Sequence, residues 1–280
     1  MRNLIALLFL GAVTALPQPY KDGFIQTNFQ VGKGSTGDSS SVLIVGGRDA
    51  QPGEFPWQVS LQILRGGANF HNCGGIIIDE THVVSAAHCE YNGYDVVAGA
   101  HSIQENESSQ QRIKALRFEP HPNFDYFKAS NDVSVITLSQ PLVFNDRVKP
   151  LRLAPTSANP EGQLCVNSGW GNANPSGGNP SIDPDVLQAV NLTIISEADC
   201  KRRFSGSNVD ETMICAHDLA GGKGACNGDS GGPLVCSDAN GPYLAGTVSW
   251  GRNPCAQAQY ASVYGRVSTA LDFINSRLNQ

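Results

Sequence analysis

Three features are scarce in this 280-residue sequence, and each scarcity weighs against a class of protein. No block of Lys and Arg occurs, and 19 basic against 25 acidic residues give a net charge of −6. That balance argues against a nucleic acid or an anionic membrane as partner. The eight cysteines form no Cys-x-x-Cys pair, so a zinc site is a weaker use for them than disulfides. No apolar run is long enough to cross a bilayer.

The N-terminus has the order of regions found in a secretory signal peptide. Arg2 precedes an apolar run from Leu4 to Val13, and small residues follow at Val13-Thr14-Ala15. A buried N-terminal helix or a membrane span is the alternative, but the run is short for a span. Residues 1–15 are therefore expected to be a signal peptide of a secreted, extracellular protein. Eight cysteines fit four disulfides in an oxidising compartment, although spacing alone leaves their pairing open.

Residues 16–43 differ in composition from the rest of the chain. Glycine and serine are frequent there, cysteine is absent, and no apolar period is sustained. Such a segment buries too little surface to offset its ordering entropy. We expect a flexible leader that can be cleaved off, although a plain linker has the same composition.

From Ile44 onward the pattern is that of short β-strands separated by turn residues. Runs rich in Val, Ile and Leu occur at Gln58–Leu64, Gly75–Ile78, His82–Ser85, Val133–Leu138, Gln188–Ile195 and Leu244–Trp250. A helix is expected at the C-terminus, where Leu271, Ile274 and Leu278 recur at helical spacing and Ser268 or Thr269 can cap. The pattern favours β-barrels or sandwiches without choosing between them. Prolines near 150–163 indicate a connector between two β halves.

A glycine-flanked serine is the first candidate for chemistry. Cys226 to Pro233 reads C-N-G-D-S-G-G-P, and bare backbone beside a serine lets a substrate carbonyl approach N–H donors. Alone, such a stretch is usually only a turn. Two further motifs strengthen the case, S-A-A-H-C at 85–89 and N-D-V at 131–133, which add a histidine beside a cysteine and an aspartate at the head of a strand.

Taken together, the motifs from Ile44 to Gln280 resemble those of the trypsin/chymotrypsin-type serine endopeptidases. I-V-G-G at 44–47, A-A-H-C, N-D-V, S-G-W-G at 168–171, G-D-S-G-G-P and S-W-G at 249–251 follow the family's order. The resemblance implies an all-β fold of two packed six-stranded antiparallel β-barrels with a C-terminal α-helix, and a site in the cleft between the barrels. The run around the serine also resembles arthropod digestive collagenases.

The resemblance assigns a role to each motif residue. Ser230 would attack the scissile carbonyl while His88 takes its proton and later passes it to the leaving amine. Asp132 would orient the imidazole and stabilise its cation. The backbone N–H groups of Gly228 and Ser230 would form the oxyanion hole.

Other residues could in principle fill these positions. His88 could be a packed core histidine, but the remaining histidines lie outside such a motif, and His101 and His121 are expected in loops. Asp125 and Asp146 are alternative acids, yet neither precedes a Val-x-Val-Ile strand. The resemblance also implies the disulfides Cys73–Cys89, Cys165–Cys236, Cys200–Cys215 and Cys226–Cys255.

The primary pocket of this family has its floor six residues before the nucleophile, where trypsins carry an aspartate. Gly224 occupies that position here. The other implied pocket residues are Ala225, Ser249, Gly251 and Ser262, and the stretch 255–264 contains no acid. An uncharged floor does not compensate for the desolvation of a cation, so we expect cleavage after Leu, Phe, Tyr or Met. Ser262 is expected to narrow the pocket.

The I-V-G-G motif implies a zymogen activated by cleavage between Leu43 and Ile44. In the family the new ammonium pairs with the aspartate beside the nucleophile, here Asp229. A leader ending in leucine is a poor site for a trypsin. The activating protease is therefore expected to be the protein itself or a chymotrypsin-like sibling.

No cofactor and no metal are expected. Trypsins bind calcium in a loop whose matching ends here are Ala100 and Gln110, which leaves Glu105 and Glu107 in a solvated acidic loop. Asn106 and Asn191 lie in N-glycosylation sequons. Expected partners are protein or peptide substrates, protein protease inhibitors and the activating protease, with no nucleic acid and no membrane, and the protein is expected to be a monomer.

Two alternatives to this hypothesis differ in class. A non-catalytic homologue would bind partners through the same fold, but such proteins typically lose a triad residue or the activation sequence, and this chain keeps both. A trypsin with basic specificity conflicts with Gly224 and Ser262. The absence of extra domains favours digestion over immunity, venom or moulting.

Overall fold

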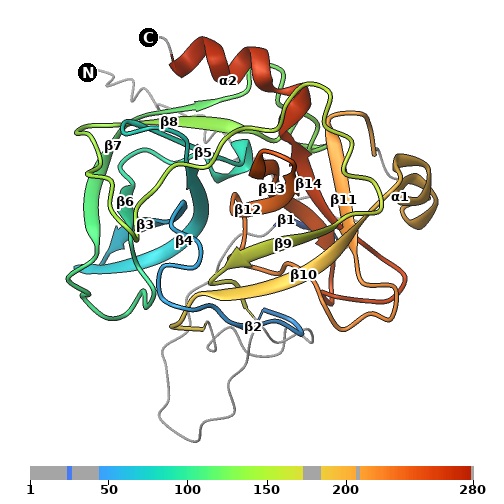
Figure 1. Ribbon diagram of the computed structural model, residues 1–280, viewed down its shortest axis with the longest axis horizontal. Helices are drawn as coiled ribbons and strands as arrows, with labels where there is room; N and C mark the ends of the chain where they lie inside the picture. Colours follow the sequence, from blue (N-terminus) through green and yellow to red (C-terminus); the bar gives the residue numbers. More distant parts are fainter. Residues whose placement is uncertain (1–23, 27–43, 173–183, 206–208, 279–280) are drawn as a thin grey trace, which may run out of the picture.

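The computed structural model describes residues 24–26, 44–172, 184–205 and 209–278. It contains two antiparallel β-barrels packed side by side, with a helix at the C-terminal end (Figure 1). The predicted fold class is confirmed. The predicted signal peptide, residues 1–15, and Leu43 of the predicted cleavage site lie outside the described residues.

The first barrel is formed by six strands in the order β3-β4-β5-β8-β7-β6. Their bounds are Gln58–Arg65 for β3, Ala68–Ile77 for β4, His82–Ser85 for β5, Asp95–Ala98 for β6, Gln111–Pro120 for β7 and Ser134–Leu138 for β8. The first six residues of β3 are all buried, because one face lines the barrel and the other is covered by neighbouring segments. In the antiparallel β3–β4 pair, Val59 lies opposite Gly75 and Leu61 opposite Cys73.

The second barrel is formed by β9 to β14, in the order β13-β12-β9-β10-β11-β14, and the pairing of β13 with β14 closes it. The strands are Leu164–Gly169 for β9, Gln188–Ile195 for β10, Met213–His217 for β11, Pro233–Asp238 for β12, Gly241–Arg252 for β13 and Ser262–Arg266 for β14. The short β2 (Arg48–Asp49) pairs with β10. The chain passes from the first barrel to the second between the end of β8 and the start of β9.

The two barrels share one apolar core. Ile76, Val84 and Val135 come from the first barrel and are fully buried in the same cluster as second-barrel residues such as Leu234 and Tyr264. Burial of this size is the main stabilisation of the interface. The position of one barrel is therefore fixed by the other, and side chains from both can meet with a defined geometry.

The helices differ in part from the prediction. The C-terminal helix α2 spans Leu271–Leu278 and buries Phe273 and Ile274, as the apolar spacing indicates. Ser268 and Thr269 do not cap it, because Val267–Thr269 forms the 3₁₀ turn η2 and the Thr269 hydroxyl donates to Arg266 O.

A second helix, α1, was not predicted. It spans Glu197–Arg203, and Ser196 caps it by accepting a hydrogen bond from Asp199 N at 3.0 Å. Seven residues are too few for the apolar period of a helix to stand out. Within the described residues no helix is long and apolar enough to cross a membrane.

The leader was expected to lack regular structure, and this expectation was wrong at one place. Phe24–Gln26 forms the strand β1, which pairs antiparallel with the end of β13, with Ile25 opposite Gly251. The physical reason is the edge that β13 presents beyond its pairing with β12, which ends at Thr247, since an unpaired edge accepts an added strand. Figure 1 shows β1 behind the second barrel's strands, beside β13.

Candidate active site

The structure brings Ser230, His88 and Asp132 together where the two barrels meet. His88 Nε2 lies 2.8 Å from Ser230 Oγ, and His88 Nδ1 lies 2.7 Å from Asp132 Oδ2. The main-chain N–H of His88 also donates to Asp132 Oδ1 at 2.9 Å, so both carboxylate oxygens are bound by one residue. A hydroxyl bound to an imidazole that is itself oriented by a carboxylate is the arrangement that makes a serine nucleophilic. The alternative acids Asp125 and Asp146 bind surface groups instead.

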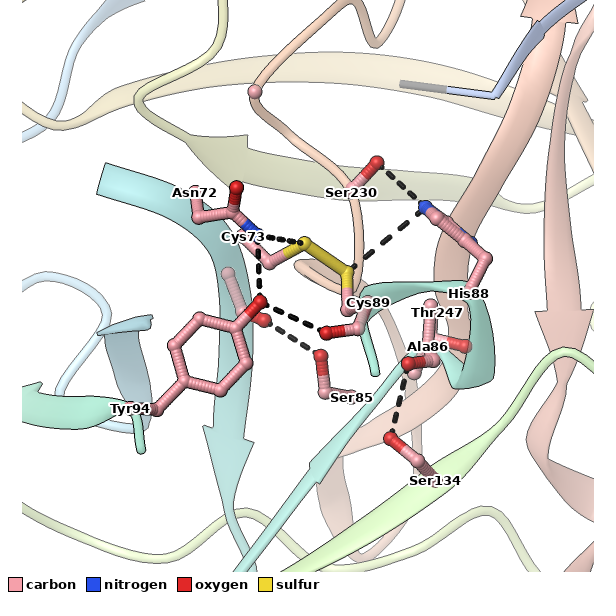
Figure 2. Close-up of a disulfide and its surroundings, with 12 residues drawn as sticks. Asn72, Cys73, Ser85, Ala86, His88, Cys89, Tyr94, Ser134, Ser230 and Thr247 are labelled. Atoms are coloured by element: carbon pink, nitrogen blue, oxygen red, sulfur yellow. Dashed lines mark hydrogen bonds between the residues drawn. A yellow bond between two sulfur atoms is a disulfide. The ribbon is translucent and has the colours of Figure 1, made fainter. Parts of the chain in front are cut away.

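The first barrel holds the histidine through a disulfide at the end of β5. His88 lies in the 3₁₀ turn η1 (Ala87–Cys89), and Cys89 is joined to Cys73 of β4. Figure 2 shows the ring of Tyr94 beside this disulfide, with its hydroxyl donating to Cys89 O at 2.8 Å and accepting from Asn72 Nδ2 at 2.6 Å. The turn is thus tied covalently and by hydrogen bonds on both sides, which fixes the direction of the imidazole.

Asp132 is buried, and its surroundings keep it ionised. Burial opposes ionisation, but the charge of the nearby His88 ring and hydrogen bonds from His88 and Ser249 outweigh it and hold the pKa of Asp132 below its usual range. Ser249 Oγ donates to Asp132 Oδ2, and Thr247 Oγ1 donates to Asp132 O at 3.1 Å. Two hydroxyls of β13, in the second barrel, therefore hold the acid of the first.

Ser230 lies in a loop whose glycines are needed for close packing. Gly228 and Gly231 have φ values of +93° and +71°, in the left-handed region that favours glycine. A Cβ on Gly231 would overlap the Ser85 hydroxyl, and one on Gly228 would approach Gly171 Cα to 3.0 Å. The loop is bound to the first barrel through Gly74 N, which donates to Ser230 O at 2.7 Å.

His71 contributes to this loop and was missed by sequence reasoning. Its Nε2 lies 2.8 Å from Gly228 O and its Nδ1 lies 2.8 Å from Ser60 Oγ. The ring therefore fixes the peptide of a residue predicted to form the oxyanion hole. Burial lowers the pKa of His71 to about 4, so the ring is neutral near pH 7. No motif surrounds His71, and only the fold brings it 157 residues along the chain to Gly228.

Asp229 explains the glycines of the S-G-W-G motif. Its buried carboxylate accepts hydrogen bonds from Gly171 N and Cys226 N, both at 2.9 Å. A Cβ on Gly169 or Gly171 would overlap this carboxylate. The two glycines are therefore required for the carboxylate to fit beside β9.

The I-V-G-G segment is buried beside the same loop. Ile44 is fully buried in the shared core, and Val45 O accepts a hydrogen bond from Gly224 N at 3.2 Å. A Cβ on Gly46 would overlap Gly222 O. The residues that follow the expected cleavage point thus contact the predicted pocket floor directly.

A pocket lies in the second barrel, next to the disulfide Cys226–Cys255. Three of the predicted pocket residues line it, namely Ala225, Gly251 and Ser262. The hydroxyl of Ser249, another predicted pocket residue, is turned toward Asp132. Gly224, the predicted floor, lies beside Ser262. A Cβ there would lie 3.2 Å from Ser262 Oγ, so the Ser262 side chain covers the floor.

Several lining residues were not predicted. They include Arg252 and Tyr260, together with the disulfide Cys226–Cys255 and the apolar side chains of Val248 and Trp250. Arg252 directly follows the S-W-G motif, so extending that motif by one residue would have added Arg252 to the predicted lining. Tyr260 has no such signal.

Four disulfides are present within the described residues, and they are the pairs that the resemblance implies: Cys73–Cys89, Cys165–Cys236, Cys200–Cys215 and Cys226–Cys255. The sequon residues Asn106 and Asn191 are both exposed. Glu107 was expected in a solvated acidic loop, and its side chain is partly buried. Its carboxylate accepts hydrogen bonds from His101 N and Ser102 N and so closes its own loop.

Comparison with known proteins places this site in a family. The family model described as Trypsin matches residues 44–274. Trypsin-1 of Astacus astacus is 42% identical over 240 residues, which cover 83% of this chain and 99% of that protein. Serine protease 1 of Rattus norvegicus is 40% identical over 278 residues, covering 99% of both chains. Anionic trypsin of Canis lupus familiaris is 38% identical over 278 residues, covering 99% of this chain and 98% of that one.

A serine endopeptidase is the class of protein that the fold and the site define. The chain belongs to the trypsin family of these enzymes. Its substrates are accordingly proteins or peptides.

Proposed function

We propose that this chain is the secreted zymogen of an endopeptidase that cleaves peptide bonds after apolar residues, with Leu, Phe, Tyr or Met preferred. The observation that carries the proposal is the pocket lined by the predicted specificity residues Ala225, Gly251 and Ser262, whose lining contains no Asp or Glu. A substrate lysine or arginine there would lose its hydration without gaining a carboxylate partner. The names of the relatives favour cleavage after basic residues as the alternative, which the substrate series below tests.

The proposed reaction follows the family's Ser-His-Asp chemistry. Ser230 Oγ attacks the scissile carbonyl as His88 Nε2 accepts its proton, and the N–H groups of Gly228 and Ser230 stabilise the oxyanion. His88 then protonates the leaving amine, and water repeats the sequence on the acyl-enzyme. Asp132 keeps His88 Nδ1 protonated and stabilises the imidazolium. The 2.8 Å distance from Ser230 Oγ to His88 Nε2 supports direct proton transfer, and the 2.7 Å distance from His88 Nδ1 to Asp132 supports the orienting role of the carboxylate.

Residues 1–15 are proposed to be the signal peptide and 16–43 the activation peptide of a zymogen whose peptidase domain is 44–280. Cleavage between Leu43 and Ile44 would create an ammonium at Ile44, which pairs with Asp229. The contact of Val45 with Gly224 supports a direct link between this cut and the pocket. The four disulfides use every cysteine, so none tethers the leader after the cut. They also support an extracellular location.

Peptide-substrate profiling of protein with Ile44 at its N-terminus tests the specificity. The cleaved residue is varied over Arg, Phe, Tyr, Leu and Ala, with Ser230→Ala as the blank. We expect kcat/KM after Leu or Phe to exceed that after Arg by at least about 100-fold, since an unpaired buried charge costs several kcal/mol. Faster turnover after Arg would contradict the apolar specificity, and no turnover above the blank would favour the non-catalytic homologue.

Activation is tested on the full-length protein. The wild type alone is expected to release a chain that begins at Ile44, whereas Ser230→Ala stays intact until active enzyme is added. Persistence of the full-length wild type would leave activation to a chymotrypsin-like sibling. Rapid cutting at Leu43–Ile44 by trypsin would contradict both.

A further inference from the structure

The leader strand β1 lies on the edge of β13 that also contacts the loop of Ser230. On this edge the pairing of β12 with β13 ends at Thr247. The next residue, Val248, accepts a hydrogen bond through its main-chain oxygen from Gly231 N at 2.8 Å, and Gly231 directly follows Ser230. β1 then pairs with Trp250–Arg252. The leader strand is therefore placed along β13 just beyond the catalytic serine's loop.

The pairing of Trp250 shows that β1 and this loop share one edge. Trp250 lies opposite Gln26 of β1 and also opposite Val263 of β14. A strand has two edges, and β14 takes one of them, so β1 lies on the other, the edge that β12 uses earlier in β13. An extended segment added to a sheet edge is bound by its main chain, whatever its side chains are.

The residues of β13 that pair with β1 are also residues of the pocket. Trp250, Gly251 and Arg252 all line it, and so does Val248, which connects the pocket to the serine loop. The main chain of the leader therefore runs along a wall of the pocket. A peptide that extends along this wall needs the same main-chain groups of β13, so the leader and the peptide exclude each other.

The direction of β1 is also that of a substrate on this edge. β13 runs from Ser249, which donates to the catalytic aspartate, to Arg252. Because the pair is antiparallel, β1 runs from Phe24, opposite Arg252, to Gln26, opposite Trp250, and so toward the catalytic end of β13. A substrate chain runs the same way when the residues before its scissile bond lie along this edge.

The catalytic groups are already assembled in this chain, which still carries its leader. His88 Nε2 lies 2.8 Å from Ser230 Oγ, and His88 Nδ1 lies 2.7 Å from Asp132. Separation of the triad therefore does not account for an inactive precursor. Occupation of the β13 edge by the leader does, because it acts on access of the substrate rather than on the reacting groups.

We propose that β1 is an autoinhibitory strand, which occupies the edge of β13 that a substrate peptide uses and keeps the uncut chain inactive. The inference rests on the proposed function, in which the pocket receives substrate and a cut between Leu43 and Ile44 activates the chain. Pairing through three residues is weak, but the covalent connection holds β1 at an effective concentration on the order of millimolar. The cut removes this connection, and the leader then dissociates.

The test uses full-length protein with Leu43→Pro, which removes the expected cleavage site. Two probes of Ser230 are compared, an extended peptide aldehyde with a C-terminal phenylalanine aldehyde and the small reagent phenylmethanesulfonyl fluoride. Deletion of residues 16–26 should lower the inhibition constant of the aldehyde at least about tenfold, since the tethered competitor is lost. The sulfonyl fluoride is too short to need the edge, and its rate should change less than about twofold. Equal changes for both probes, or none, would overturn the inference.

Two proline variants of the same uncut protein are matched controls for each other. Alternate residues of an antiparallel strand direct their N–H groups to the same side, so Ile25→Pro and Phe24→Pro/Gln26→Pro remove donors from opposite sides of β1. The set that removes donors facing β13 should reproduce the effect of the deletion, and the other set should not. Equal effects of the two sets would mean that the ladder is not what inhibits, and would overturn the inference.

Failure of the proposed function gives a different result. A synthetic peptide of residues 16–43 is titrated by NMR into Ser230→Ala protein that begins at Ile44, which requires no turnover and no particular substrate. Shifts of the Trp250 and Gly251 amides at about 1 mM peptide, abolished by one proline set and kept by the other, would support the strand even if cleavage after apolar residues fails. Absence of these shifts would overturn it.

Discussion

The two barrels have the same topology and make unequal contributions to the site. The first barrel supplies His88 and Asp132, the groups that handle protons, and one disulfide, Cys73–Cys89, fixes the histidine turn. The second supplies Ser230, the pocket and the segment that contacts Val45, and it contains the other three disulfides. Proton transfer needs a single imidazole held in one orientation, whereas substrate recognition needs several loops held in place together. The larger number of disulfides in the second barrel is consistent with this difference.

The largest expected effect comes from removing a catalytic side chain from either barrel. Ser230→Ala and His88→Ala should each lower kcat by about 10⁶-fold, although the residues come from different barrels, and the double variant should lose no more. The two groups act as one unit, so removing either disables the other. Single-turnover kinetics with the apolar substrate measure this. Additive losses would mean that each barrel acts independently.

Removing one disulfide from each barrel sharpens the comparison. Cys73→Ala/Cys89→Ala should lower kcat about equally for every substrate, because the histidine turn loosens. Cys226→Ala/Cys255→Ala should instead raise KM and reduce the discrimination between Leu and Arg substrates, since both cysteines line the pocket. Each pair should cost about 2–5 kcal/mol of stability.

Thermal unfolding of the two double variants supplies the control for the kinetics. Comparable losses of Tm with different kinetic signatures would support the division between barrels. Identical signatures would mean that the cross-links stabilise the fold without serving separate tasks.

The smallest expected effect concerns acid and the contact of His71 with Gly228. The folded pKa of His71 is about 4, below the 6.5 of a free histidine, so the unfolded chain binds a proton that the folded one rejects between these values. Stability from this group is complete above pH 6.5 and falls by about 3 kcal/mol as the pH drops toward 4. Urea unfolding of a Ser230→Ala background at pH 7 and 4.5 measures the loss.

His71→Gln should flatten that pH dependence. His121→Gln is the matched control, because His121 is less buried and should change the slope less. An unchanged slope in His71→Gln would mean that other groups govern the acid sensitivity.

Much of this molecule could be predicted because its motifs are local. The strands His82–Ser85 and Gln188–Ile195 have the predicted bounds, and each triad residue lies within a short, recognisable run of letters. The features that were not predicted depend on contacts between segments that are distant in the sequence. His71 reaches Gly228 only through the fold, and the sequence does not say that the Ser249 hydroxyl donates to Asp132. The sequence indicates only a surface charge at Glu107, because its hydrogen bond to His101 N depends on the conformation of the loop.

The 2.8 Å bond between His88 and Ser230 joins atoms that belong to different barrels. The length of this bond therefore depends on how the two barrels pack against each other. A shift of about 1 Å between reacting groups can cost about 100-fold in rate. An active-site titration of this protein therefore counts the molecules in which the two barrels are correctly packed. A ligand that binds elsewhere and shifts one barrel against the other would inhibit the enzyme without contacting the catalytic residues.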